Sequence, residues 1–123
     1  TVRVSSPQLE ADAEHFAGLL NKFGKSVERV LATYQKDIVD QQHQLGRIGD
    51  VAMELYVSAC VLRRLDAALR GSSPVKVHRE LLTGRYYLNT AARRMRDRLS
   101  ALWNNDDQAT NELANHLLKQ AAN

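Results

Sequence analysis

The residues most able to bind a metal are four histidines, His15, His43, His78 and His116. A carboxylate-bridged dimetal site in a helical bundle needs Glu-x-x-His on two helices and an inward Glu on two others. Only the segment from Asp12 to His15 imitates that spacing. Asp12 and His15 lie one position off the apolar stripe of Ala13 and Phe16, so they flank the core. The pattern therefore argues against a metal site and for solvated histidines on helix surfaces.

Nucleophile and phosphate-loop chemistry also lack their required partners. The single cysteine, Cys60, lies in the apolar run 57–62 without a neighbouring His or positive charge to activate its thiol. It cannot form an internal disulfide, which favours a reducing compartment. The segment 46–49, Gly-Arg-Ile-Gly, has neither the P-loop Lys-Ser/Thr nor a preceding strand. We interpret Gly46 and Gly49 as sites of close helix approach.

Composition indicates one compact domain over residues 1–123. Hydrophobic residues make up 44% and charged residues 25% of the chain, with only 2 Pro and 6 Gly. Charges interrupt every window long enough to span a bilayer, and the first residues do not resemble a signal peptide. We expect a soluble or peripheral protein with a cytoplasmic location. Because the chain starts at Thr1 without Met, we also expect it to be a piece of a longer protein.

Helix punctuation predicts four helices and no strand. Ser6-Pro7 and Ser73-Pro74 each combine an N-cap residue with a proline suited to the first helical turn. Apolar residues recur at steps of three and four between these signals, and the acidic residues Asp106 and Asp107 can cap a short last helix. The predicted ranges are 7–34, 38–70, 74–103 and 107–120. Short connections make neighbours antiparallel, so the expected fold class is all-α, a four-helix up-and-down bundle.

The second predicted helix is apolar nearly all round. Its expected inward stripe contains Leu45, Ile48, Ala52, Leu55, Ala59 and Leu62. A 100° wheel places a second apolar group on the opposite side, namely Met53, Val57, Cys60 and Val61. Such a helix has to be covered on both faces. We therefore predict that this second group lies in a domain or subunit interface or, alternatively, beneath the last helix.

The third predicted helix carries most of the positive charge. Between residues 76 and 98, seven basic and two acidic residues give a net charge of +5, against +3 for the whole chain. Its outward face groups Lys76, Arg79, Tyr86, Arg93 and Arg94. This group is either an ordinary solvated face or a docking surface for an acidic protein, an anionic lipid or phosphate. The basic residues spread around the helix without helix-turn-helix spacing, which argues against nucleic acid.

One segment also carries a family resemblance. Residues 36–42, Lys-Asp-Ile-Val-Asp-Gln-Gln, and residues 45–56, Leu-Gly-Arg-Ile-Gly-Asp-Val-Ala-Met-Glu-Leu-Tyr, resemble the central stretch of a family's C-terminal helical domain. The family is that of very-long-chain acyl-CoA dehydrogenases and their complex I assembly paralogue. Residues 6–34 are similar to the opening helix of that domain in length and pattern. The resemblance fades beyond Gly71.

The resemblance implies a non-catalytic C-terminal domain of a longer FAD-dependent dehydrogenase of fatty acid β-oxidation. In the family, FAD, the acyl-CoA pocket and the catalytic base belong to the preceding domains, so no catalytic, cofactor-binding or metal-binding residue is carried over to this chain. The implied partners are the dehydrogenase core, a second subunit of a homo-oligomer, and the inner membrane, on its matrix side in a eukaryote. The alternative is a stand-alone helical module whose basic helix binds nucleic acid or an acidic protein.

Overall fold

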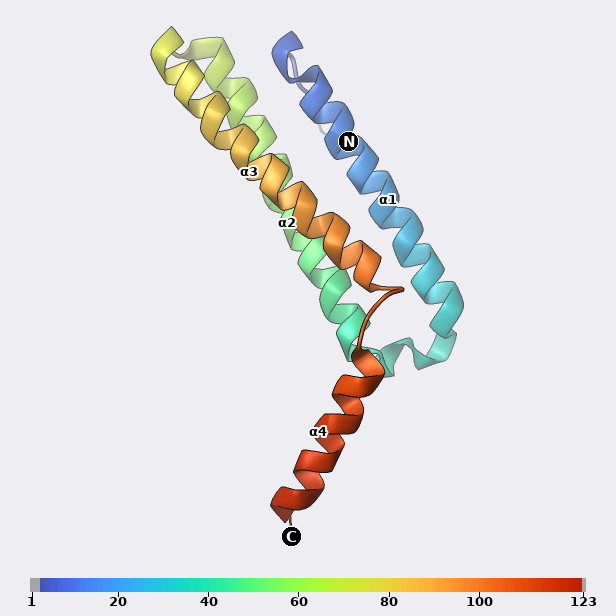
Figure 1. Ribbon diagram of the computed structural model, residues 1–123. Helices are drawn as coiled ribbons and strands as arrows, with labels where there is room; N and C mark the ends of the chain where they lie inside the picture. The colour runs from blue at the N-terminus through green and yellow to red at the C-terminus, as the bar shows by residue number, and fades with distance from the viewer. Residues whose placement is uncertain (1–2, 123) are drawn as a thin grey trace.

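The computed structural model describes residues 3–122, and this part of the chain contains helices and no strand (Figure 1). The all-α, four-helix prediction is confirmed. The elements in chain order are a 3₁₀ turn η1 (Pro7–Leu9), α1 (Glu10–Tyr34), a 3₁₀ segment η2 (Gln35–Asp40), α2 (Gln42–Gly71), α3 (Pro74–Ala101) and α4 (Asp107–Ala122). Among the described residues, none of the helices has an apolar stretch that could span a lipid bilayer.

Local signals explain where the helices begin and end. The Ser73 hydroxyl accepts a hydrogen bond from the Lys76 backbone N–H at 3.4 Å, and Pro74 occupies the first turn of α3. Helix α1 ends at Tyr34 because Gln35 has φ 49°, which a continuing helix cannot accommodate. The following 3₁₀ segment delays α2 to Gln42, so the predicted start at residue 38 was four residues early.

Helices α1, α2 and α3 pack lengthwise as antiparallel neighbours, whereas α4 leaves the end of this stack (Figure 1). Helix α2 has its most extensive contacts with α3. No residue of α4 is buried, and Leu113, Leu117 and Leu118 are each more than half exposed. The expected up-and-down order thus holds for the first three helices. The alternative that the last helix covers the reverse of the second was wrong, because α4 points away from it.

The core lies between α1, α2 and α3. Its buried apolar residues include Phe16, Leu19 and Val30 of α1, Val51, Leu55 and Leu62 of α2, and Ala91, Met95 and Leu99 of α3. Val51 and Leu62 are at most 1% exposed. The predicted stripe of α2 was partly wrong, since Leu45 and Ala52 are exposed and Gln44 and Val51 are buried instead. Because α2 is apolar on several sides, hydrophobic periodicity alone could not fix its inward face.

Helices α2 and α3 approach each other closely at Gly84. A Cβ atom at this position would lie 2.7 Å from Leu65 Cδ1, closer than real side chains permit. Gly46 and Gly49, for which we predicted this role, have no atom within 4 Å of the equivalent position. That interpretation was therefore wrong, because both glycines lie on the exposed side of α2.

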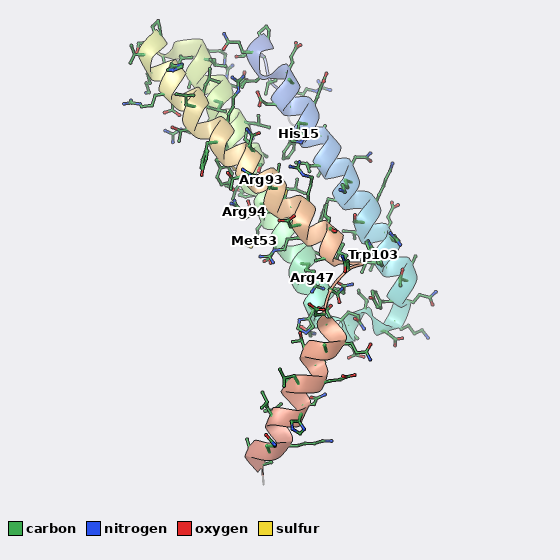
Figure 2. The ribbon with its side chains drawn as sticks, viewed as in Figure 1. His15, Arg47, Met53, Arg93, Arg94 and Trp103 are labelled. Carbon is green, nitrogen blue, oxygen red and sulfur yellow. The ribbon has the colours of Figure 1, made fainter. Side chains whose placement is uncertain are left out.

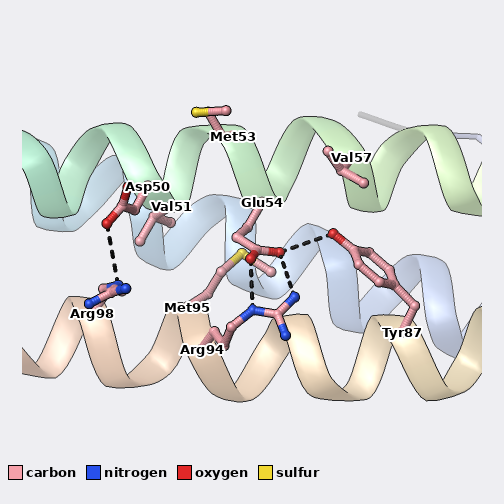
Figure 3. A pocket seen from close by; sticks show the side chains of 9 residues that line it. All are labelled: Asp50, Val51, Met53, Glu54, Val57, Tyr87, Arg94, Met95 and Arg98. Carbon is pink, nitrogen blue, oxygen red and sulfur yellow. Dashed lines mark hydrogen bonds and ion pairs between the residues drawn. The ribbon is translucent and has the colours of Figure 1, made fainter.

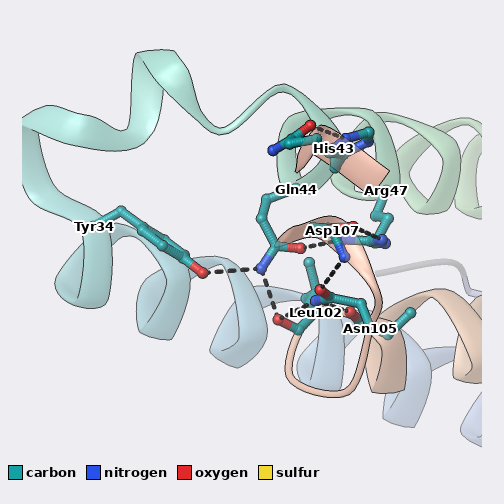
Figure 4. Close-up of polar contacts among 9 residues, drawn as sticks. Tyr34, His43, Gln44, Arg47, Leu102, Asn105 and Asp107 are labelled. Carbon is teal, nitrogen blue, oxygen red and sulfur yellow. Dashed lines mark hydrogen bonds and ion pairs between the residues drawn. The ribbon is translucent and has the colours of Figure 1, made fainter. Parts of the chain in front are cut away.

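A polar cluster around Gln44 joins the ends of all four helices (Figure 4). The buried Gln44 amide donates to the Leu102 carbonyl at 2.6 Å and to the Tyr34 hydroxyl at 3.3 Å. Its carbonyl oxygen accepts from Arg47, whose guanidinium also forms a two-pronged ion pair with Asp107 at 2.5 and 2.7 Å. Paired donors and acceptors of this kind have a fixed geometry. The cluster therefore sets the direction in which α4 leaves the stack.

Candidate docking surface

The predicted reverse face of α2 is largely open to solvent. The Met53 side chain is 71% exposed, Val57 is 41% exposed and Cys60 is also exposed, while Val61 is partly buried. Figure 2 shows Met53 on the side of α2 that faces away from α1. Met53 and Val57 are exposed because of the helical periodicity. Val51, Leu55 and Ser58 face the core, so residues between them on the other side of α2 face outward. We call Met53, Val57, Cys60 and Val61 the α2 outer row.

A groove of about 280 Å³ runs between the α2 outer row and α3 (Figure 3). Met53 and Val57 line it from α2, and Tyr87, Arg94 and Arg98 line it from α3. The buried residues Val51 and Met95 lie at its base. The groove therefore combines an apolar base and edge with charged groups along α3, which is the usual composition of a protein interface.

Glu54 is the polar centre of this groove. Its carboxylate accepts hydrogen bonds from Arg94 at 2.7 and 3.1 Å and from the Tyr87 hydroxyl at 3.0 Å. The Arg94 hydrogen bond holds the pKa of Glu54 below its usual range, against the opposing effect of burial. Burial, followed by the hydrogen bond to Glu54, raises the pKa of Tyr87. At neutral pH the site is therefore a charged Glu54–Arg94 pair beside a neutral phenol.

A second ion pair lies beside the first but contributes less. Arg98 Nε is 3.4 Å from Asp50 Oδ2, and both side chains are more than half exposed. Exposed pairs of this kind typically contribute about 0–1 kcal/mol, because water screens the charges. The Glu54–Arg94 pair has shorter contacts, and its Glu54 side chain is only 24% exposed. It is therefore the better ordered of the two.

The groove continues toward the other end of the stack. There a hollow of about 360 Å³ is lined by Val61, Leu65 and Arg79 among others. Arg64 pairs with Glu80 at 3.2 Å across this hollow. Hydrogen bonding to Arg64 lowers the pKa of Glu80. Along residues 50–65 of α2 and 79–98 of α3, the two hollows thus combine apolar residues with charged residues from both helices.

The structure separates the members of the predicted basic face. Lys76, Tyr86 and Arg93 are exposed, and Tyr86 is 74% exposed. Arg79 is exposed at the edge of the second hollow, whereas Arg94 turns to Glu54. Of the seven basic residues in α3, Arg85, Arg94 and Arg98 pair with acidic groups. Lys76, Arg79, Arg93 and Arg96 have no acidic partner within 4 Å among the described residues.

The histidines and Cys60 are not assembled into a site. In the described range, no group of three or more His, Cys, Asp and Glu side chains could hold a metal ion. His15 lies 3.5 Å from Arg96, and His43 contacts Asn111 of α4 at 3.1 Å. Both are exposed contacts between helices.

Sequence reasoning missed the polar residues Gln44, Glu54 and Asp66, which link separate parts of the chain by hydrogen bonds, and it also missed the buried Ser58. Gln44, Ser58 and Asp66 are all buried in α2. A usable signal existed, because these three positions share the helical spacing of the buried residues Val51, Leu55, Leu62 and Leu65. A polar residue within an apolar stripe indicates a buried polar group, which needs a hydrogen-bond partner. Glu54 carries no comparable signal, since its partners Tyr87 and Arg94 are distant in the sequence.

Comparisons with known proteins match most of this chain to one protein family. The family model described as ACAD9/ACADV, C-terminal domain, matches residues 7–123. The chain is 31% identical over 101 residues to very long-chain specific acyl-CoA dehydrogenase, mitochondrial, of Bos taurus, covering 82% of this chain and 15% of that protein. The Homo sapiens protein of the same name is 32% identical over 96 residues, covering 78% of this chain and 14% of that protein. No solved structure matches the chain.

Proposed function

Because this chain belongs to the ACAD9/ACADV C-terminal domain family, we propose that it works as one part of a larger protein. The chain corresponds to the C-terminal part of acyl-CoA dehydrogenases and spans about 15% of the length of its relatives. Its function is that of a non-catalytic structural and interaction domain. The parent protein is an FAD-dependent dehydrogenase of long or very long fatty acyl-CoA, and this domain docks on its dehydrogenase core or on a second subunit.

The observation that carries this proposal is the open α2 outer row. Met53 and Val57 expose apolar surface beside a groove whose base is also apolar. Exposed apolar surface next to a hollow favours association, because contact with a partner removes it from water. The dehydrogenase core supplies a partner for this surface within the same polypeptide.

The charged residues along α3 give this docking its specificity. In the isolated chain, the Glu54 carboxylate already accepts hydrogen bonds from Arg94 and from the Tyr87 hydroxyl. An ordered polar edge limits which surfaces fit, because a partner has to match its donors and acceptors. A partner that places an apolar ridge against Met53 and Val57, and polar groups near Arg94 and Arg98, satisfies both requirements.

Protection of Cys60 tests the docking directly. Cys60 is the single cysteine of the chain and is exposed in the α2 outer row. In the isolated 123-residue chain, a maleimide reagent should modify it rapidly and completely. In the full-length protein that contains this domain, a peptide-resolved mass measurement should show the same cysteine protected. Equal modification rates in both forms would contradict docking through this face.

The second part of the proposal is that the isolated chain has no dehydrogenase activity. FAD and the acyl-CoA substrate belong to the dehydrogenase core of the parent protein, so the purified chain should be colourless. It should bind no flavin and should not reduce an electron acceptor in the presence of palmitoyl-CoA. Stoichiometric flavin binding, or thioester oxidation above a buffer blank, would refute the proposed role as a non-catalytic domain.

Membrane association is a further proposed role, and the unpaired cations of α3 support it. Lys76, Arg79 and Arg93 lie on its exposed side with Tyr86, whose ring can enter the interfacial region. Each such cation near an anionic bilayer contributes about 1 kcal/mol, and added salt screens the attraction. The chain should therefore sediment with phosphatidylglycerol or cardiolipin vesicles at low salt and be released at high salt.

Charge reversal at two exposed residues tests the membrane role. The Arg79→Glu, Arg93→Glu double variant should lose vesicle binding and keep its thermal stability, because neither side chain has an ion-pair partner in the described structure. Zwitterionic vesicles provide the control. Unchanged binding by the double variant, or no binding by the wild-type chain, would leave this face as an ordinary solvated surface.

A further inference from the structure

One buried hydroxyl in the core lacks a hydrogen-bond partner. Ser58 of α2 is 2% exposed, and its Oγ atom contacts no donor or acceptor in the described structure. It occupies a stripe position between the buried residues Leu55 and Leu62. Buried polar atoms are almost always hydrogen-bonded, because losing water without a replacement partner is unfavourable. We therefore expect the Ser58 hydroxyl to have a hydrogen-bond partner other than a protein atom.

A small cavity adjoins this hydroxyl where three helices meet. Phe16 and Leu19 of α1, Ser58 of α2, and Leu88 and Met95 of α3 line it. Its volume is about 20 Å³. One water molecule occupies about 10–15 Å³ of such a cavity. The space is therefore large enough for one water molecule.

The cavity also offers the polar contacts that an ordered water needs. A buried water typically makes about three hydrogen bonds. Ser58 Oγ supplies one, and Asp12, His15 and Asn89 are the other polar residues that line the cavity. His15 and Asn89 are exposed, which places them at its mouth. Polar groups at the mouth and a hydroxyl at the base are the arrangement that a bridging water requires.

We propose that this cavity is a binding site for one structural water, which connects Ser58 of α2 to polar groups of α1 and α3. The water would satisfy the Ser58 hydroxyl and fill the space between α1 and the α2–α3 pair. Helix α1 contacts that pair less extensively than α2 and α3 contact each other. A water-mediated link therefore holds α1 at a point where direct side-chain packing is incomplete. This inference does not depend on the proposed docking function.

A crystal structure of the chain at about 1.5 Å resolution tests the site directly. The expected result is an ordered water within hydrogen-bond distance of Ser58 Oγ, roughly 2.5–3.2 Å, and of at least one group on α1 or α3. In solution, the methyl groups of Leu19 and Met95 should show cross-relaxation with a long-lived water. A Ser58 hydroxyl that instead donates to the backbone carbonyl of the preceding turn, with no water beside it, would overturn the proposal.

The Ser58→Ala variant gives an independent thermal test. If the water is bound, removing its anchor should lower the melting temperature by a few degrees, while circular dichroism shows an intact helical fold. If the hydroxyl has no partner, its removal should raise the melting temperature, because an unfavourable buried group disappears. An unchanged or raised melting temperature would therefore count against the site. The exposed Ser100→Ala change is the matched control and should have little effect.

Discussion

Asp66 is the residue that ties the start of the chain to α2. Its carboxylate accepts hydrogen bonds from the backbone N–H groups of Ser5 and Ser6 at 3.1 and 3.0 Å, and from the Ser5 hydroxyl at 3.2 Å. Ser6, the expected N-cap, makes no side-chain capping bond of its own. An acidic side chain from α2 thus accepts hydrogen bonds from the backbone N–H groups of the two residues that precede η1, whereas the Ser6 hydroxyl caps no backbone N–H inside the turn.

The Asp66 contacts predict a defined dependence of stability on pH. Hydrogen bonding, chiefly from the Ser5 backbone, lowers the pKa of Asp66 from 3.8 to about 2. The carboxylate therefore stabilises the fold fully above pH 4, and this contribution is lost as the pH falls toward 2. Asp66→Asn should lower the melting temperature at pH 7 and have little effect near pH 2. A melting-temperature difference that stays constant between pH 7 and pH 2 would contradict this assignment.

Gly84 predicts opposite effects for the same substitution at two glycines. In Gly84→Ala, the new methyl group would collide with the buried Leu65, and such overpacking costs about 1–3 kcal/mol. The higher helix propensity of Ala offsets about 1 kcal/mol of this cost, so Gly84→Ala should lower the free energy of unfolding by about 1 kcal/mol. Gly49→Ala, which meets open space, should instead stabilise the chain by about 1 kcal/mol. Chemical denaturation of both variants measures the change in the free energy of unfolding. A change of the same sign in both variants would refute the close approach at Gly84.

At the scale of elements, the sequence predicted most helix boundaries because the signals for them are local. Ser73-Pro74 places the start of α3 at residue 74, as observed. The inward face of α2 was only partly predictable, because apolar residues surround that helix and Gln44 and Ser58 take core positions. The direction of α4 could not be predicted, since it depends on Arg47 and Asp107, 60 residues apart in the chain. Local patterns specify elements, whereas a few long-range polar contacts orient them.

The Arg47–Asp107 pair predicts that α4 can be released without unfolding the other helices. In Asp107→Ala, α4 loses its ion pair with Arg47 and keeps one exposed contact, between His43 and Asn111, which is too weak to fix its direction, while the apolar core of α1, α2 and α3 remains. Residual dipolar couplings of α4 amides should shrink toward zero, and those of the other helices should be unchanged. Glu112→Ala is the control, because the hydrogen bond of Glu112 lies within α4. Full-sized α4 couplings in Asp107→Ala would show that other contacts orient this helix.

At the scale of the whole molecule, two apolar surfaces remain open. One is the α2 outer row, and the other is formed by the exposed leucines of α4. The position of the α2 outer row was predicted from the sequence, because the helical wheel identified a second apolar side. The groove beside it was not, since it is built by Glu54, Tyr87 and Arg94 from two helices. Together these features describe a domain with more apolar surface than its own helices cover.

The substitution Val57→Asp tests most directly whether the α2 outer row docks on a partner. Val57 is 41% exposed, so the isolated chain should lose little stability, within about 0.5 kcal/mol. In the full-length protein, the same carboxylate would be buried without a partner, at a cost of several kcal/mol. A lower melting temperature and a smaller oligomeric mass are expected only in the full-length form, and Val75→Asp is the exposed control. Unchanged melting temperature and mass in full-length Val57→Asp would contradict docking through the α2 outer row.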